Sequence, residues 1–162
     1  MNVEWMERYR PLMRALVNHT NSACRFANIR TDVKDGILLN HYDWQVLEYL
    51  YEHEENDEHM LHMSNVLGIA QSSFSNITKT LCHYHLIKRY HTRTNKKNVI
   101  LKITDLGKEV YEHHVTTHLK DYFTPMFTVL NELSDTQLDV FVRALDTFNH
   151  VDEKNDHDLI PE

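Results

Sequence analysis

The chain has 162 residues, of which 41% are hydrophobic and 25% are charged, as in a globular protein with one compact domain and an added layer. It has no apolar run of about 18 residues and no apolar leader, so we expect a cytoplasmic protein without a membrane span. Two cysteines are too few for a disulfide framework, and three glycines and three prolines leave room for long helices.

The charge is distributed unevenly along the sequence. The whole chain carries a formal charge of −7, which by itself disfavours binding to nucleic acid. Residues 59–104, however, contain no Asp or Glu and seven Lys or Arg, whereas the rest of the chain has ten Lys or Arg and 24 Asp or Glu. A basic segment in an acidic chain is typical of a surface that binds phosphates. A basic face that is only solvated would show the same charge pattern, and charge alone does not distinguish the two.

A helix followed by a loop is predicted at the start of the chain. Apolar residues recur at helical spacing over residues 5–29, and Pro11 predicts a kink or a new first turn within them. Residues 31–38 contain two Asp and one Gly and are expected to form the loop.

Two further helices are predicted before residue 70. Asn40 caps the first of them, with Asp43 at the position that completes a capping box, and the acidic residues 52–58 end it. A short helix follows over residues 60–67. Gly68 stands where a left-handed residue would end that helix.

The helix predicted over residues 71–84 has two contrasting faces. Phe74, Ile77 and Leu81 form a narrow apolar stripe. The opposite face has short hydrogen-bonding side chains and one cation, which can approach base edges in the major groove closely. An ordinary surface helix more often carries Glu, Lys and Arg there. We therefore predict that this face binds DNA through Ser72, Ser73, Ser75, Asn76, Thr78 and Lys79.

The apolar period changes from helical to alternating after this helix, which predicts two strands over residues 86–91 and 98–103. The six residues between them are polar and include the cations Arg93, Lys96 and Lys97. We predict a wing, a basic hairpin whose cations lie along the minor groove or its phosphates beside the recognition helix.

The last third of the chain is expected to be helical. A long helix is predicted from residue 105 to about 131, with a kink at Pro125. Ser134 and Gln137 form a capping-box pattern that begins a final helix. These helices carry more apolar residues than one small winged domain can cover. Either packing within the chain or contact with a second subunit would explain this excess.

This order of elements resembles the MarR family of winged-helix transcription regulators. The family's closing motif, Leu-Thr-x-x-Gly, corresponds to Ile-Thr-Asp-Leu-Gly at residues 103–107, and its turn and recognition helix correspond without gaps to residues 68–81. The resemblance implies a mainly α (α+β) fold, a winged helix-turn-helix with a two-stranded wing and N- and C-terminal dimerisation helices. The expected parts are an N-terminal dimerisation helix and loop, the DNA-binding domain, C-terminal dimerisation helices and a flexible acidic tail, at residues 1–38, 39–104, 105–151 and 152–162.

The resemblance also implies a homodimer on a near-palindromic operator in double-stranded DNA, with two recognition helices about one DNA turn, roughly 34 Å, apart. It implies repression that an effector releases. The chain departs from the family in its wing, where Lys96 and Lys97 stand in place of the usual Arg and suit a narrow minor groove less well. Ala70 replaces the usual capping acid of the recognition helix, and Gln71 or Ser72 is expected to take over part of its role.

The effector has three candidate classes. His114 and His118 are four residues apart on one predicted helix face, the spacing for a shared metal, and zinc-sensing members of the family have His at both positions. Val33 and Gln45 stand where those members complete their sites. Oxidation of Cys24 is the second candidate, although a buried structural thiol is the better interpretation. The third is an organic molecule beside the aromatic residues Trp44, Tyr49, Tyr111 and Tyr122, most of which are more simply core.

An enzyme is not expected, because the sequence has no Gly-rich phosphate loop, no nucleophile elbow and no carboxylate pair beside a histidine in one motif. No cofactor is expected other than zinc at His114 and His118. The stronger rival function is a winged-helix domain that binds protein, which the acidic balance outside residues 59–104 suits. The salt dependence of DNA affinity distinguishes the two functions.

Overall fold

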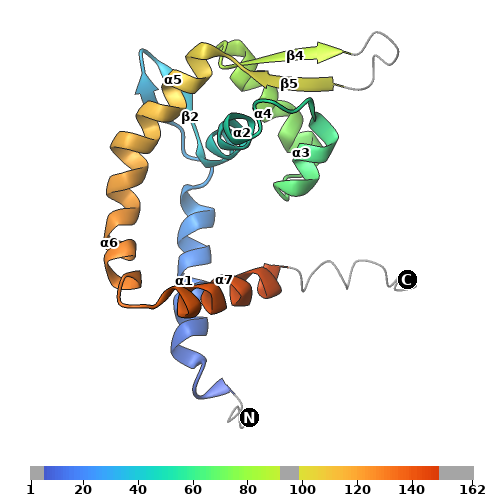
Figure 1. Cartoon of the computed structure of the whole chain (residues 1–162). Helices are drawn as coiled ribbons and strands as arrows, with labels where there is room; N and C mark the ends of the chain where they lie inside the picture. The colour runs from blue at the N-terminus through green and yellow to red at the C-terminus, as the bar shows by residue number, and fades with distance from the viewer. Residues whose placement is uncertain (1–5, 92–98, 150–162) are drawn as a thin grey trace, which may run out of the picture. The chain divides into compact units, whose positions relative to one another are not determined.

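The structure is a computed structural model that describes residues 6–91 and 99–149. The chain divides into two compact units, residues 1–115 and residues 116–162. The first unit holds the helices α1 to α5 and two small sheets, and the second holds α6 and α7 (Figure 1).

Helix α1 (Arg10–Phe26) has Pro11 in its first turn. Of the two outcomes predicted for Pro11, a new first turn is therefore the one found, because the start of a helix needs no N–H from that residue. No side chain of α1 is buried against the described residues, although Leu12, Met13 and Val17 are large, apolar and exposed. Helix α1 thus presents an apolar face that the other described residues of the first unit do not cover.

The loop predicted over residues 31–38 is wrong. Strands β1 (Thr31–Lys34) and β2 (Ile37–Leu39) form a small antiparallel hairpin there. Asp35 and Gly36 turn between them with positive φ angles of 51° and 83°, as an Asp-Gly hairpin turn requires. The turn signal is present in the sequence, but strands of four and three residues are too short to show an alternating pattern.

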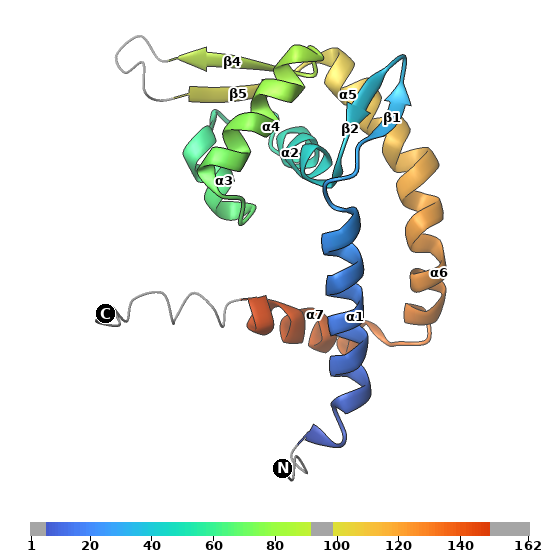
Figure 2. The same ribbon diagram turned by 180° about the vertical axis from the view of Figure 1, so that it is seen from behind.

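Helix α2 (His41–Glu52) begins with the predicted capping box. The Asn40 side-chain oxygen accepts a hydrogen bond from the Asp43 N–H at 3.0 Å, and the Asp43 carboxylate accepts one from the Asn40 N–H at 2.9 Å. Helix α2 lies at the centre of the first unit, between α4 (Gln71–His83) and α5 (Asp105–His114) (Figures 1 and 2).

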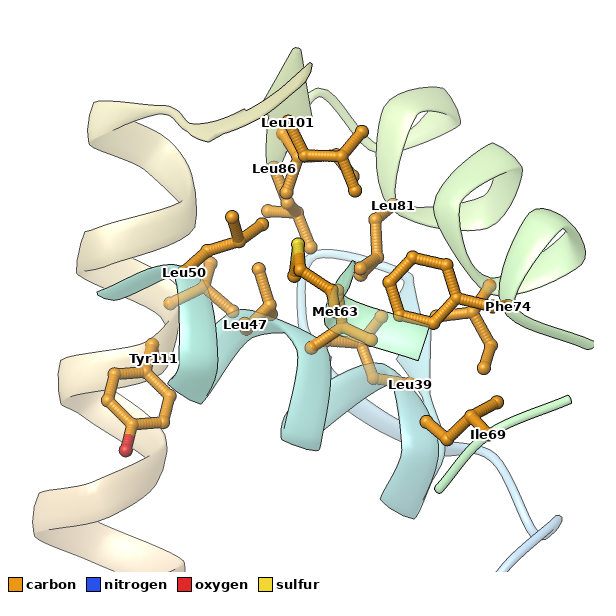
Figure 3. Close-up of a cluster of buried hydrophobic side chains, with 14 residues drawn as sticks. Leu39, Leu47, Leu50, Met63, Ile69, Phe74, Leu81, Leu86, Leu101 and Tyr111 are labelled. Atoms are coloured by element: carbon orange, nitrogen blue, oxygen red, sulfur yellow. The ribbon is translucent and has the colours of Figure 1, made fainter. Parts of the chain in front are cut away.

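The hydrophobic core of the first unit lies where α2, α4, α5 and the larger sheet meet (Figure 3). The predicted apolar stripe of α4 belongs to it, because Phe74, Ile77 and Leu81 are all buried. Full burial of one such side chain stabilises the fold by about 1.5–3 kcal/mol. Other large side chains with no exposed surface are Leu39, Leu47, Met63, Leu86 and Leu101. Helix α4 is therefore anchored along one side and free along the other.

The larger sheet has three antiparallel strands in the order β3-β5-β4. Strands β4 (Ile87–His91) and β5 (Val99–Ile103) pair along their whole length, which confirms the predicted hairpin. Strand β3 (Glu58–His59) adds to the other edge of β5, so the sheet at the base of the wing has three strands where two are predicted. Two residues after an acidic stretch carry no strand pattern, and only pairing with β5 makes them a strand.

The region predicted as one long helix, residues 105–131, is not a single regular α-helix. After α5 the chain continues through a π-helical turn (Val115–Leu119) and then α6 (Lys120–Leu130), which contains Pro125. The helical geometry thus changes at the π-helical turn. The predicted kink at Pro125 is not tested and stays a prediction. Helix α7 (Asp135–Asn149) starts at the predicted capping box, where the Ser134 N–H donates to the Gln137 side-chain oxygen at 2.9 Å.

Helices α6 and α7 also expose large apolar side chains. Among them are Tyr122, Phe127, Val129, Val142 and Phe148. None of the described helices is long and apolar enough to cross a membrane.

Candidate nucleic-acid interface

A tight turn around Gly68 joins α3 (Met60–Val66) to α4. Gly68 has a φ of +62°, the left-handed conformation predicted for it. The Ile69 N–H donates to the Ser64 carbonyl at 2.9 Å and the Gly68 N–H donates to the Asn65 carbonyl at 3.1 Å, the two bonds of a Schellman motif. Ile69 is buried in the core, so the turn sets the angle at which α4 leaves α3.

The same motif ends α4, but without a glycine. His85 has a φ of +58°, while its N–H donates to the Cys82 carbonyl at 3.0 Å and the Leu86 N–H donates to the Leu81 carbonyl at 2.9 Å. Leu86 is fully buried and leads directly into β4. Both ends of α4 are thus determined by backbone geometry, which orients the helix relative to the wing.

The outer face of α4 is exposed, with one correction to the predicted contacts. Thr78 is fully buried, and its hydroxyl donates to the Ser75 carbonyl at 3.0 Å. It lies four residues after Phe74 and three before Leu81, so it shares the buried stripe and has no surface to offer DNA. Ser75 is half-buried. The exposed members of the predicted set on this helix are Ser72, Ser73, Asn76 and Lys79.

The N-terminus of α4 has no side-chain cap. Ala70 is the N-cap residue, and neither Gln71 nor Ser72 supplies the capping hydrogen bond expected of them. The first N–H groups of the helix are therefore without a side-chain acceptor from the described residues. N–H groups at a helix start favour an anion such as a phosphate.

An open depression of about 910 Å³ lies beside this N-terminus, between α3, the first turns of α4 and the larger sheet. Its lining combines the apolar side chains of Met60, Leu61, Phe74 and Val99 with polar ones and a single arginine, and the described residues contribute no Asp or Glu to it. His62 and Arg89 belong to the lining and are absent from the predicted contacts, although both fall within the acid-free residues 59–104. The described lining thus places no negative charge that would repel a DNA strand.

The cations of residues 59–104 are not all available in the folded chain. Lys79, Lys88 and Arg89 are exposed on α4 and β4. Lys102 instead pairs with Asp57, whose carboxylate lies 3.0 Å from its Nζ, and it also donates to a backbone carbonyl at 2.6 Å. The positive charge of residues 59–104 is therefore partly neutralised in the folded chain by an acidic residue outside that segment. Arg93, Lys96 and Lys97 lie outside the described residues.

The motif at residues 103–107 fastens the base of the wing to the end of α4. The Thr104 hydroxyl accepts the Gly107 N–H at 3.0 Å as the N-cap of α5, and it lies 2.8 Å and 3.0 Å from the carbonyl oxygens of His85 and Leu86. A Cβ on Gly107 would overlap the Leu86 carbonyl and the Ile103 side chain. The spacing of Thr and Gly in the motif thus has a steric reason.

The predicted metal ligands, His114 and His118, lie at the end of α5 and in the π-helical turn. The His114 ring stacks on Trp44 with centroids 3.7 Å apart. Among residues 6–91 and 99–149, no group of three or more His, Cys, Asp or Glu side chains is arranged to hold a metal. Structural zinc sites have four ligands, so two histidines alone do not make one, and zinc binding stays a prediction.

The two cysteines differ in their surroundings. Cys24 is exposed, so the interpretation of it as a buried thiol is wrong, because α1 does not pack into its own chain. Cys82 is half-buried, and burial raises the pKa of its thiol, although the nearby Arg89 lowers it. A raised pKa leaves less of the reactive thiolate at neutral pH.

The aromatic residues considered for an organic effector are partly core. Tyr111 is buried, and its hydroxyl donates to Glu48 at 3.2 Å. Burial raises the pKa of Tyr111 well above its ordinary value, and Glu48 adds to the shift. Trp44 and Tyr49 pack at the edge of the core, whereas Tyr122 is exposed on α6.

No protein-family model matches this sequence, and no curated protein sequence matches it. Solved structures do match. MepR of S. aureus in complex with DNA is 17% identical with a TM-score of 0.61, covering 86% of this chain and 95% of that one. A mutant of Lactococcus lactis ZitR in complex with DNA is 17% identical with a TM-score of 0.62, covering 90% and 97%. The adhesin competence repressor AdcR of Streptococcus pyogenes is 19% identical with a TM-score of 0.61, covering 86% and 96%.

The chain has the MarR-like fold. This confirms the predicted fold class, a mainly α winged helix-turn-helix flanked by N- and C-terminal helices. In the MarR-like fold of this chain, α3 and α4 form the helix-turn-helix and β4 and β5 form the base of the wing.

Proposed function

We propose that this protein regulates transcription by binding double-stranded DNA sequence-specifically. One observation carries this function: α4 exposes Ser72, Ser73, Asn76 and Lys79 on the side away from the core, beside a depression lined by no described acidic residue. Short polar side chains on an anchored helix can read base edges, and the cations around them contact phosphates. MepR and ZitR have this fold in complexes with DNA, which supports the same partner here.

The two parts of the surface have different roles in this function. Asn76 and the serines of α4 contact bases in the major groove, while Lys79, Lys88 and Arg89 neutralise phosphates. Arg93, Lys96 and Lys97 of the wing hold the neighbouring backbone or minor groove. Because Lys is more strongly hydrated than Arg, the wing contributes more to affinity than to the choice of sequence.

We further propose that the DNA-binding form is a homodimer. Helices α1, α6 and α7 expose apolar faces that a second copy would cover. Two-fold symmetry then places two α4 helices on one side of the duplex, about 34 Å apart, so that the preferred site is a near-palindrome. In this proposal the protein represses transcription, leaves the DNA when an effector binds, and acts in the cytoplasm.

The test begins with selection of duplexes from a random pool by the purified protein, followed by fluorescence anisotropy on the selected site and on a scrambled one. Asn76→Ala is expected to lose about tenfold or more of the preference for the selected site, since one good base contact contributes ~1–3 kcal/mol. Lys79→Ala is expected to weaken both duplexes alike and to reduce the salt slope by about 0.9, because it removes one phosphate contact. Lys120→Ala on α6 removes the same charge elsewhere and is the control.

A winged-helix domain that binds protein is the second candidate function. The observation in its favour is that Leu61 and Val66 on α3 are large, apolar and exposed. If the protein binds no duplex at low salt, DNA binding is excluded and this second function is preferred. An affinity for DNA that does not change with salt would instead exclude the proposed phosphate contacts.

Zinc as the effector would use His114 and His118. Calorimetric titration of zinc into the protein and into His114→Ala tests this directly. Identical heats for the two proteins would exclude a zinc site at this pair.

A further inference from the structure

We propose that Arg30 is a positioning residue that holds the recognition helix α4 in its DNA-reading orientation. This role rests on the proposed binding of DNA by α4. Arg30 lies between α1 and β1, in neither the helix-turn-helix nor the wing. Its guanidinium nevertheless contacts β2, α2 and α4.

Three acceptors surround the Arg30 guanidinium. One nitrogen, Nη1, donates to the Leu38 carbonyl at 2.9 Å and lies 3.2 Å from the Asp43 carboxylate. The other, Nη2, lies 3.5 Å from the Thr80 hydroxyl of α4. A planar guanidinium with five N–H donors can serve three acceptors in fixed directions, whereas the single ammonium of lysine cannot.

The anchor of this contact is rigid. Asp43 is fully buried and is held by the capping box at the start of α2. Arg30 is the cation that pairs with this carboxylate, and its side chain is 37% exposed. The guanidinium is therefore fixed from the protein side, and its position is set by α2.

The contact continues from Thr80 to the DNA-reading face. The Thr80 hydroxyl donates to the Asn76 carbonyl at 3.2 Å, one turn earlier in α4. Asn76 is the exposed amide of the predicted reading surface. A short path of polar contacts thus runs from Asp43 through Arg30 and Thr80 to the backbone of Asn76.

Arg30 is also close in sequence to the end of α1. Helix α1 ends at Phe26, and the carbonyl of the next residue, Ala27, accepts the His41 N–H of α2 at 3.3 Å. A shift of the end of α1 would therefore move Arg30 relative to Asp43 and Thr80. Because α1 is proposed to contact the second subunit, Arg30 couples the dimer to the orientation of α4.

Arg30 has an alternative role that the test must separate, which is direct contact with a DNA phosphate. A phosphate contact contributes to every duplex alike and adds about 0.9 to the salt slope. A positioning residue changes the affinity for the preferred site and leaves the salt slope unchanged. The salt slope therefore distinguishes the two roles.

The experiment compares Arg30→Gln, Arg30→Lys and Thr80→Val with the control Arg25→Gln, which removes an exposed arginine in the last turn of α1. Affinity is measured for the selected and scrambled duplexes across a salt series. We expect Arg30→Gln to lose at least tenfold on the selected duplex alone, with the salt slope of wild type.

Arg30→Lys should not rescue this loss. The double variant Arg30→Gln with Thr80→Val should be no worse than Arg30→Gln, because both changes break one path. Equal loss on both duplexes with a smaller salt slope, additive losses, or an effect no larger than that of Arg25→Gln would each overturn the role.

Loss of Arg30 also leaves a buried carboxylate without its cation, which destabilises the fold. Asp43→Asn removes that charge and keeps an oxygen to accept the Asn40 N–H. Arg30→Gln is therefore compared with Asp43→Asn, which breaks the same path without leaving a buried carboxylate unpaired. A similar loss of preference in both variants supports positioning, and a loss in Arg30→Gln alone shows that the defect came from instability.

Hydrogen exchange of the α4 amides is measured without DNA in the wild type and in Arg30→Gln. Faster exchange over residues 71–83 when Arg30 is absent supports the contact even if the wild type binds no duplex, in which case only the proposed function fails. Unchanged exchange together with unchanged DNA preference would overturn the role of Arg30.

Discussion

Gly107 lies directly against the backbone carbonyl of Leu86, where the first turn of α5 meets the end of α4. Gly107→Ala is expected to lower the free energy of unfolding by about 1–3 kcal/mol, because a Cβ there overlaps backbone that cannot move aside easily. Urea denaturation measures the change. Gly36→Asn is the control, since nothing lies within 4 Å of a Cβ at that turn and Asn tolerates positive φ. Equal and small losses for both variants would contradict the steric explanation.

His85→Gly is expected to stabilise the protein by about 1 kcal/mol. His85 has a left-handed conformation with φ +58°, which costs a residue other than glycine ~1–3 kcal/mol. Glycine removes this cost but raises the entropy of the unfolded chain, which offsets part of the gain. His83→Gly, two residues earlier and still within α4, should instead destabilise by about 0.5–1 kcal/mol. Thermal or urea unfolding of the two variants checks the opposite signs. If both variants are less stable than wild type, the left-handed conformation of His85 does not cost the folded protein the expected free energy.

Asp43→Asn is expected to change how stability depends on pH. Burial raises the pKa of Asp43 above its ordinary value of 3.8, against the opposing effects of the Asn40 hydrogen bond and of Arg30. A carboxyl group with a raised pKa binds its proton more readily in the folded state, so its contribution is most favourable at low pH and declines as the pH rises through the folded pKa.

Wild type should therefore lose stability relative to Asp43→Asn over the pH range that begins at the ordinary pKa of 3.8 and ends above the raised pKa of the folded state. Urea denaturation of both proteins at several pH values in this range measures the difference. A difference that grows in favour of wild type as the pH rises would show that the ion pair with Arg30 outweighs burial.

The proposed dimer predicts that charge on the apolar face of α1 dissociates the protein. Val17→Glu is expected to yield monomers in sedimentation equilibrium at micromolar concentration and to weaken binding to the selected duplex. Val66→Glu on α3 is the matched control for the sedimentation measurement, because Val66 and Val17 are 55% and 56% exposed in the single chain. A wild-type protein that is already monomeric, or equal effects of the two changes, would exclude this dimer interface.

Much of the fold follows from residues that are close together in the sequence. The capping boxes at Asn40 and Ser134, the turn at Gly68 and the hairpin of β4 and β5 are all predicted correctly. Each depends on backbone hydrogen bonds or side-chain periods within a few positions, so local chemistry is enough to specify them. The exposed serines of α4, with Asn76 and Lys79, are predicted for the same reason.

The structure decided which of those residues are available. Thr78 lies at helical spacing from Phe74 and Leu81 and is buried with them, although its polar side chain predicts a place on the outer face. Lys102 falls in an acid-free segment, but pairing of β3 with β5 leaves it beside Asp57. No period relates Lys102 to Asp57, so only tertiary structure could show that this cation is paired.

The contact between Arg30 and Thr80 is the clearest case, because 50 positions separate the two residues. The sequence by itself determined the helix that carries the reading face. The packing of α4 against α2 determined what lies behind that helix. The physical reason is that helices and turns are specified by neighbouring residues, whereas the contacts of a guanidinium depend on which elements the folded core brings together.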